Sequence, residues 1–112
     1  MTEEQEQEDF RKLVETCARE FQTTADEILG KSKVHNVATA RHLVAALWSD
    51  NHSYMDTARR LNKSKHWTIM NSRERIRFLV ETDKWMSRVC ADVVKELGLY
   101  DTGTTSYESN EK

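Results

Sequence analysis

Hydrophobic residues recur at intervals of three and four along most of this chain, and that spacing is typical of amphipathic α-helices. Phe10, Leu13 and Cys17, for example, fall on one face of a predicted helix. Polar stretches without this period separate such segments and are predicted to be short turns. The pattern predicts six helices, at about 9–21, 25–29, 36–48, 54–61, 65–80 and 83–97.

Residues with capping chemistry mark several of the predicted helix ends. Thr24 and Ser53 precede the second and fourth helices, and each has an acidic residue, Glu27 or Asp56, three positions later. This is the spacing of a capping box, in which two side chains satisfy backbone N–H groups reciprocally. Gly98 follows the sixth helix, and glycine commonly ends helices.

The composition supports an all-α fold, because the 112 residues include no proline and only three glycines. The length suggests one domain. We expect a compact six-helix domain at 9–98, between an acidic disordered tail at 1–8 and a second disordered tail at 99–112. The start at Met1 and the tapering end favour a complete protein over an excised domain.

The formal net charge of −2 hides an uneven distribution. Between Lys31 and Arg77, ten Lys or Arg residues stand against three Asp or Glu residues, a net charge of +7. The residues before Phe10 include five acidic side chains and no basic one, a net charge of −5. A basic middle between acidic ends favours a localised site for a polyanion, and the alternative is a merely solvated face.

Residues 54–76 predict a helix-turn-helix. A short helix is followed by a polar turn, Asn62-Lys63-Ser64, and by a longer helix that opens with Lys65-His66-Trp67-Thr68. In this motif the second helix enters the DNA major groove by its first residues. Double-stranded DNA is therefore the predicted partner.

Three stretches, in order along the chain, carry a resemblance to a known family. They are VETCAREFQTTADEILGKSK, VATARHLVAALWSD and NKSKHWTIMNSRERI. They are similar to the opening helices and basic loop, the next helix and the signature of the C-terminal DNA-binding domain of the bacterial replication initiator DnaA. The resemblance spans about Leu13 to Leu97 and implies a Trp-repressor-like, helix-turn-helix fold. The chain has no GxxxxGK(S/T) motif, so ATP-driven origin melting is not expected of it alone.

The resemblance implies two elements that contact DNA. The signature would read bases in the major groove, and the basic loop with Lys31 and Lys33 would reach the adjacent minor groove. Arg41 would hold the DNA backbone, while Thr68 and Asn71 would bind phosphate. The predicted DNA-binding residues are Lys31, Lys33, His35, Arg41, Lys63, Ser64, Lys65, His66, Trp67, Thr68 and Asn71.

The signature departs from the family pattern at its reading positions. Lys65 stands where the family has an aspartate, Trp67 where it has a threonine, and Lys33 where it has a minor-groove arginine. Lysine donates to guanine O6 and N7, whereas aspartate accepts from cytosine, so we expect an altered sequence preference. Two alternatives stay open: Lys65 contacts phosphate only, and Trp67 turns inward or meets a protein partner.

No catalytic or metal-binding pattern stands out, because the four histidines are scattered and form no H-x-x-x-H pair. Cys17 and Cys90 lie among apolar helical residues and are predicted to be buried free thiols. We expect no enzymatic activity, no cofactor and no metal. No apolar run nears the ~20 residues of a membrane span, and the acidic N-terminus is unlike a signal peptide, so we expect a cytoplasmic protein without a membrane partner.

Two classes of function fit these observations. The first is a stand-alone double-stranded-DNA-binding protein, a transcriptional regulator or replication accessory factor, which we expect to act as a monomer like the resembling domain. The second is a protein-interaction adaptor that has lost base-specific reading and binds the replication or transcription machinery. Salt-dependent retardation of duplex DNA is expected of the first class and not of the second.

Overall fold

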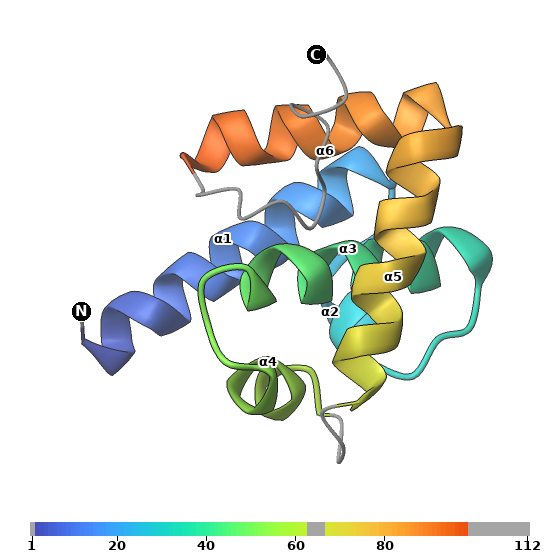
Figure 1. Cartoon of the computed structure of the whole chain (residues 1–112). Coiled ribbons are helices and arrows are strands. Elements are labelled where there is room, and N and C mark those ends of the chain that lie inside the picture. The colour runs from blue at the N-terminus through green and yellow to red at the C-terminus, as the bar shows by residue number, and fades with distance from the viewer. Residues whose placement is uncertain (1, 63–66, 99–112) are drawn as a thin grey trace.

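The computed structural model describes residues 2–62 and 67–98, and within these residues the chain is six helices and no strand (Figure 1). The all-α prediction is therefore confirmed. The C-terminal residues 99–112, predicted to be a disordered tail, lie outside the described residues. The helices are α1 Glu3–Glu20, α2 Ala25–Leu29, α3 His35–Ser49, α4 Tyr54–Arg60, α5 Trp67–Thr82 and α6 Lys84–Leu97.

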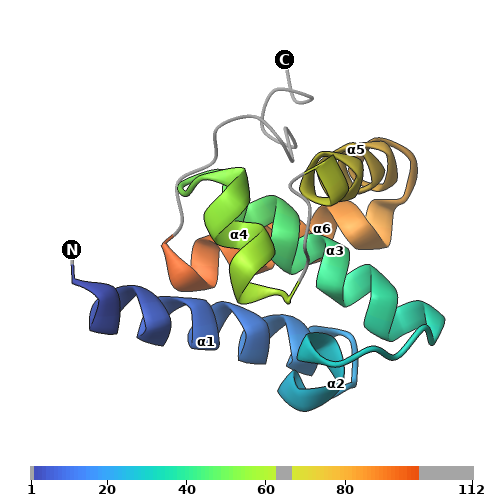
Figure 2. The ribbon, with the colours of Figure 1, turned by 90° about the horizontal axis from the view of Figure 1, so that it is seen from below.

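Helix α3 is the centre of the fold. It packs against α1, α2, α4 and α5, and two perpendicular views place it between α1 and α5 (Figures 1 and 2). Every residue from Leu43 to Ser49 is buried, so the C-terminal half of α3 is covered all round rather than along one stripe. Because α3 touches most of the other helices, it fixes their positions relative to one another.

The first helix begins six residues earlier than predicted, and the prediction of a disordered tail at 1–8 was wrong for Glu3 to Glu8. The Thr2 hydroxyl caps the helix by accepting a hydrogen bond from the backbone N–H of Gln5 at 3.1 Å. Acidic residues in the first turn also favour the positive end of the helix dipole. These turns contain no hydrophobic residue, so the apolar pattern could not reveal them.

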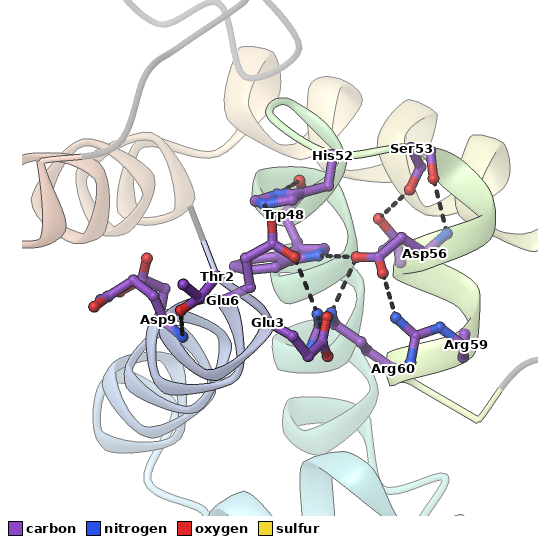
Figure 3. Close-up of polar contacts among 12 residues, drawn as sticks. Thr2, Glu3, Glu6, Asp9, Trp48, His52, Ser53, Asp56, Arg59 and Arg60 are labelled. Carbon is purple, nitrogen blue, oxygen red and sulfur yellow. Dashed lines mark hydrogen bonds and ion pairs between the residues drawn. The ribbon is translucent and has the colours of Figure 1, made fainter.

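The acidic turns are held by an arginine from a distant part of the chain. The Arg60 guanidinium, on α4, lies 3.1 Å from a Glu3 carboxylate oxygen, 3.4 Å from Glu6 and 3.0 Å from Asp56 (Figure 3). Only 6% of the Arg60 side chain is exposed. The ion pairs therefore join the start of the chain to the first helix of the predicted helix-turn-helix.

Aromatic rings complete this cluster. The Arg60 guanidinium carbon lies 5.8 Å from the centre of the Phe10 ring and 5.3 Å from the Trp48 ring, both within the range of cation–π attraction. The Trp48 indole N–H donates to Asp56 at 2.9 Å, and the His52 ring stacks on the indole at 3.7 Å. Burial raises the pKa of Asp56, but the hydrogen bonds from Trp48 and the neighbouring arginines outweigh it and lower this pKa to about 2.

The predicted helix caps at Thr24 and Ser53 are confirmed. The hydroxyls of Thr24 and Ser53 accept from the backbone N–H groups of Glu27 and Asp56, at 3.2 and 3.0 Å. In a complete capping box the Asp56 carboxylate would accept from the backbone N–H of Ser53. It accepts instead from the side chains of Trp48, Arg59 and Arg60. Gly98 ends α6 in the left-handed conformation, with φ 63°, that favours glycine.

Candidate nucleic-acid interface

The two helices of the helix-turn-helix are α4 and α5 (Figure 1). Leu61 ends α4, and Asn62 adopts a left-handed backbone with φ 60°, which asparagine tolerates better than most residues. Thr57, in the middle of α4, is fully buried and donates its hydroxyl hydrogen to the Ser53 carbonyl at 2.8 Å. The predicted DNA-binding residues Lys63, Ser64, Lys65 and His66 lie outside the described residues.

An ion pair fixes the middle of α5 on α3. Arg73 donates from one guanidinium nitrogen to the Ser49 hydroxyl at 2.7 Å and to the Asp50 carboxylate at 3.0 Å. The Asp50 side chain is 1% exposed, and the Arg73 guanidinium also lies 5.4 Å from the Tyr54 ring of α4. In the sequence Arg73 is one of the ten Lys or Arg residues of the basic middle segment. In the structure it contacts residues of α3 and α4 and so joins both helices to α5.

A second polar contact joins α3 and α5 at the neighbouring residue of α5 and nearer the start of α3. A His42 ring nitrogen lies 2.8 Å from the Ser72 hydroxyl, and Ser72 is buried. The apolar anchors of α5, Ile69 and Ile76, are 1% and 0% exposed and face the core. Helix α5 is thus held on α3 by a hydrophobic stripe and by polar contacts at two levels.

The first described turn of α5 presents side chains to solvent. Trp67 is 54% exposed, so the alternative in which it turns inward is wrong. Asn71, one turn further on, is exposed as well, and Thr68 is half-buried. Thr68 borders a small cavity of about 70 Å³ that Arg41 and Leu61 also line. The start of α5, a firmly packed helix, therefore exposes an aromatic ring and an amide that a partner can contact.

The basic loop between α2 and α3 carries the second group of predicted residues. Lys31 and Lys33 are exposed, and His35 is exposed at the first position of α3. The Ser32 hydroxyl accepts from the Val34 N–H at 3.3 Å, which bends the loop into its approach to α3. Two ammonium groups and an imidazole thus lie in solvent along a five-residue segment.

Arg41 has a different environment from the one predicted. Its guanidinium donates to three backbone carbonyls, those of Ile28 at 2.6 Å, Ser32 at 3.0 Å and Glu27 at 3.0 Å. These acceptors belong to the last turn of α2 and to the basic loop, so Arg41 binds the protein's own backbone (Figure 2 shows how the loop connects these helices). A contact between Arg41 and DNA phosphate stays a prediction.

Both arginines of α4 form ion pairs, but 63% of the Arg59 side chain is exposed against 6% of the Arg60 side chain. Arg59 pairs with Asp56 at 2.6 Å, and Arg60 is enclosed by carboxylates and aromatic rings. Neither arrangement could be foreseen from the net charge of +7, because the charge count does not distinguish internal ion pairs from solvent-facing side chains. The exposed cations of the loop are therefore better candidates for DNA contact than Arg60.

Residues 2–62 and 67–98 contain no group of three or more His, Cys, Asp or Glu side chains placed to hold a metal ion. The thiols of Cys17 and Cys90 are buried, as predicted, and burial raises the pKa of the Cys17 thiol. Within the same residues no helix has the length and apolar character needed to cross a membrane.

The comparison with known families is consistent with this geometry. A family model described as "Bacterial dnaA protein helix-turn-helix" matches residues 10–76, which is more than half of the chain. The match runs from Phe10 on α1 through the basic loop and α4 to Ile76 on α5. It leaves out the acidic first turns of α1 and all of α6. No curated protein and no solved structure matches the chain.

Proposed function

Because the chain belongs to the bacterial dnaA helix-turn-helix family, a kind of DNA-binding domain, we propose that it acts as a stand-alone sequence-preferring binder of double-stranded DNA. The observation that carries the proposal is that two elements with exposed side chains, the basic loop and the start of α5, are both attached to α3. The loop with Lys31 and Lys33 is held by Arg41, and α5 with Trp67 at its start is held by His42 and Arg73. In this role the protein is a transcriptional regulator or a replication accessory factor.

The proposed sequence preference differs from that of the family. Trp67 replaces the family's threonine with a large ring that contacts a thymine methyl or a sugar, but it has only one N–H donor. Lys65 replaces an acceptor with a donor. We expect Lys65→Ala to shift or relax the preferred sequence at a cost of about 1–3 kcal/mol in binding. Uniform weakening without a change of preference would remove Lys65 from base reading.

The remaining features of the proposal follow from the same picture. The protein acts as a monomer in the cytoplasm, without catalysis, cofactor or metal. Its acidic first turns, with Glu3 and Glu4 exposed, oppose non-specific approach of DNA to that end of the molecule.

Selection of binding sites from a random duplex library tests the proposal most directly. We expect enrichment of a defined motif, and a mobility shift on that motif that weakens steeply between 50 and 200 mM salt, as phosphate contacts require. A pool that stays random, with no shifted band at the lower salt, would reject DNA binding.

A protein-interaction adaptor is the second candidate, and exposed apolar side chains on α5 favour it. Trp67, Met70 and Phe78 are 54%, 45% and 62% exposed on the same helix. An adaptor would use this surface against a replication or transcription protein rather than DNA. The library selection separates the two candidates, because only the DNA-binding protein enriches a motif.

A further inference from the structure

We propose that Arg41 and His42 are positioning residues: together they set the distance between the loop and α5, and so the spacing of the minor-groove and major-groove contacts, without contacting DNA themselves. This inference rests on the proposed DNA binding. It assigns to Arg41 a role within the protein that replaces the predicted contact with the DNA backbone.

The first half of this junction is the hold of Arg41 on the loop. Each of its three guanidinium nitrogens donates to a carbonyl, and the acceptors span Glu27 to Ser32. The carbonyls of Glu27 and Ile28 come from the last turn of α2, and the Glu27 carbonyl also accepts from the Gly30 backbone N–H at 3.2 Å. The Ser32 carbonyl lies between the two loop lysines. The guanidinium therefore fixes the backbone on which Lys31 and Lys33 stand.

The second half is the contact of His42 with α5. The ring nitrogen of His42 and the hydroxyl of Ser72 are 2.8 Å apart, and Ser72 is only 4% exposed. Ser72 lies on the core side of α5, one turn after Thr68 and away from the exposed Asn71. This contact therefore positions α5 through its buried face and leaves the side chains of its exposed face available to a partner.

The two halves share one rigid support. Arg41 and His42 are consecutive residues of α3, and they line the same cavity of about 70 Å³ with Thr68 and Ser72. The residues that follow them on α3 are buried core residues, so this segment has little freedom to shift. A displacement of either side chain would change the position of one DNA-contacting element relative to the other.

Arginine is needed at this position for a geometric reason. Its planar, forked guanidinium reaches three carbonyls at once, whereas a lysine ammonium is a compact charge on a flexible stem. Arg41→Lys keeps the positive charge for a phosphate but cannot reproduce the three-carbonyl contact. The substitution therefore separates a positioning role from a direct electrostatic contact.

The test is a double-mutant cycle on the selected duplex. Arg41→Lys is measured alone and in the Lys31→Ala/Lys33→Ala background, with Arg88→Lys, an exposed arginine of α6, as the matched control. We expect Arg41→Lys to weaken binding about tenfold, the size of one lost charge-assisted contact. We expect the loss to disappear once the loop lysines are gone, and Arg88→Lys to bind like the wild type. A loss of equal size in both backgrounds, or no loss at all, would overturn the inference.

Ser72→Ala tests the other half, because this side chain is too deeply buried to touch DNA. We expect Ser72→Ala and His42→Ala to weaken binding by the same factor, and the double variant to lose no more than either single one. If His42→Ala weakens binding while Ser72→Ala does not, His42 acts on DNA directly and is not a positioning residue.

A measurement on the free protein distinguishes failure of this inference from failure of the proposed function. Backbone ¹⁵N order parameters of residues 31–34 are expected to fall in Arg41→Lys and to stay unchanged in Arg88→Lys. Unchanged order parameters in Arg41→Lys reject the hold on the loop even if the protein binds DNA. A wild-type protein that binds no duplex rejects the proposed function, and the order parameters still decide whether Arg41 fixes the loop.

Discussion

The two charged regions of this protein use their cations in opposite ways. Where α1 meets α4, Arg60 is enclosed by three carboxylates and two aromatic rings, and 6% of its side chain is exposed. On the loop between α2 and α3, Lys31 and Lys33 stand in solvent. One region converts charge into a tertiary contact, and the other leaves it available to a partner.

The comparison shows that residue type and surroundings decide what a cation does, more than its place in a basic segment. Arg41 and Arg60 each satisfy several acceptors from different nitrogens of the planar guanidinium, and Arg73 satisfies several from one nitrogen, which suits partly buried sites. The loop lysines are compact, hydrated charges that remain effective when mobile. A net charge of +7 over 31–77 therefore overstates the number of cations that can face DNA.

Removing the enclosed cation should produce the largest effect and would break the comparison if it did not. We expect Arg60→Ala to lower the free energy of unfolding by about 3 kcal/mol, because carboxylates and aromatic faces lose their shared partner. Urea denaturation followed by far-UV circular dichroism measures this loss. Lys12→Ala, on the exposed side of α1, is the control and should change stability by under about 0.5 kcal/mol. A similar small change in Arg60→Ala would show that the cluster adds little.

Acid should weaken the enclosed region selectively. The pKa of Asp56 is about 2 in the folded protein against an ordinary value of 3.8, so its contribution to stability is complete above pH 3.8 and is lost as the pH falls toward 2. The contribution is about 2 kcal/mol by linkage. Asp56→Asn should therefore flatten the dependence of unfolding free energy on pH between 4 and 2. Parallel curves for the two proteins would contradict this assignment.

The exposed region should respond in binding rather than in stability. We expect Lys31→Ala/Lys33→Ala to reduce the slope of log affinity against log salt by about two, one for each lost phosphate contact, while unfolding free energy stays within about 0.5 kcal/mol of the wild type. Lys84→Ala/Lys95→Ala removes the same charge from α6 and should leave the slope unchanged. Equal slopes in the two double variants would mean that the loop does not contact DNA.

The smallest effect on stability, and a sharp effect on recognition, is expected at Trp67. Trp67 is more than half exposed, so Trp67→Thr should alter unfolding free energy by under about 0.5 kcal/mol. Because threonine is the residue of the resembling family at this place, the substitution should change the motif recovered by library selection. An identical motif would show that the indole does not take part in reading bases.

Much of the fold followed from the sequence, since apolar spacing and capping residues are local signals. The positions of α2 to α4 and α6, and the caps at Thr24 and Ser53, needed only neighbouring residues. The early start of α1 could not be foreseen, because Glu3 and Glu6 gain their partner from Arg60, more than fifty residues away. The cap at Thr2, with Gln5 three positions later, is a local signal, but residue type alone does not identify Arg60 as the distant partner.

The sequence predicted the exposed residues of the candidate site but not the internal contacts that hold them in place. Exposure of Lys31, Lys33 and Trp67 agrees with their proposed contact with DNA, and the helix pattern placed them in a loop and at a helix start. The carbonyl acceptors of Arg41 and the hydroxyl partner of His42 depend on how α2, α3 and α5 pack. No spacing rule in the sequence links His42 to Ser72, thirty residues later.

The two buried thiols allow local unfolding of the protein to be detected by chemical labelling. Cys17, on α1, and Cys90, on α6, are both 0% exposed, so a thiol-reactive dye can modify neither until its helix leaves the core. Comparing the labelling rates of the single-cysteine variants Cys17→Ala and Cys90→Ala shows whether the two helices detach together or in succession. Oxidation of the two thiols should likewise be confined to molecules that have opened.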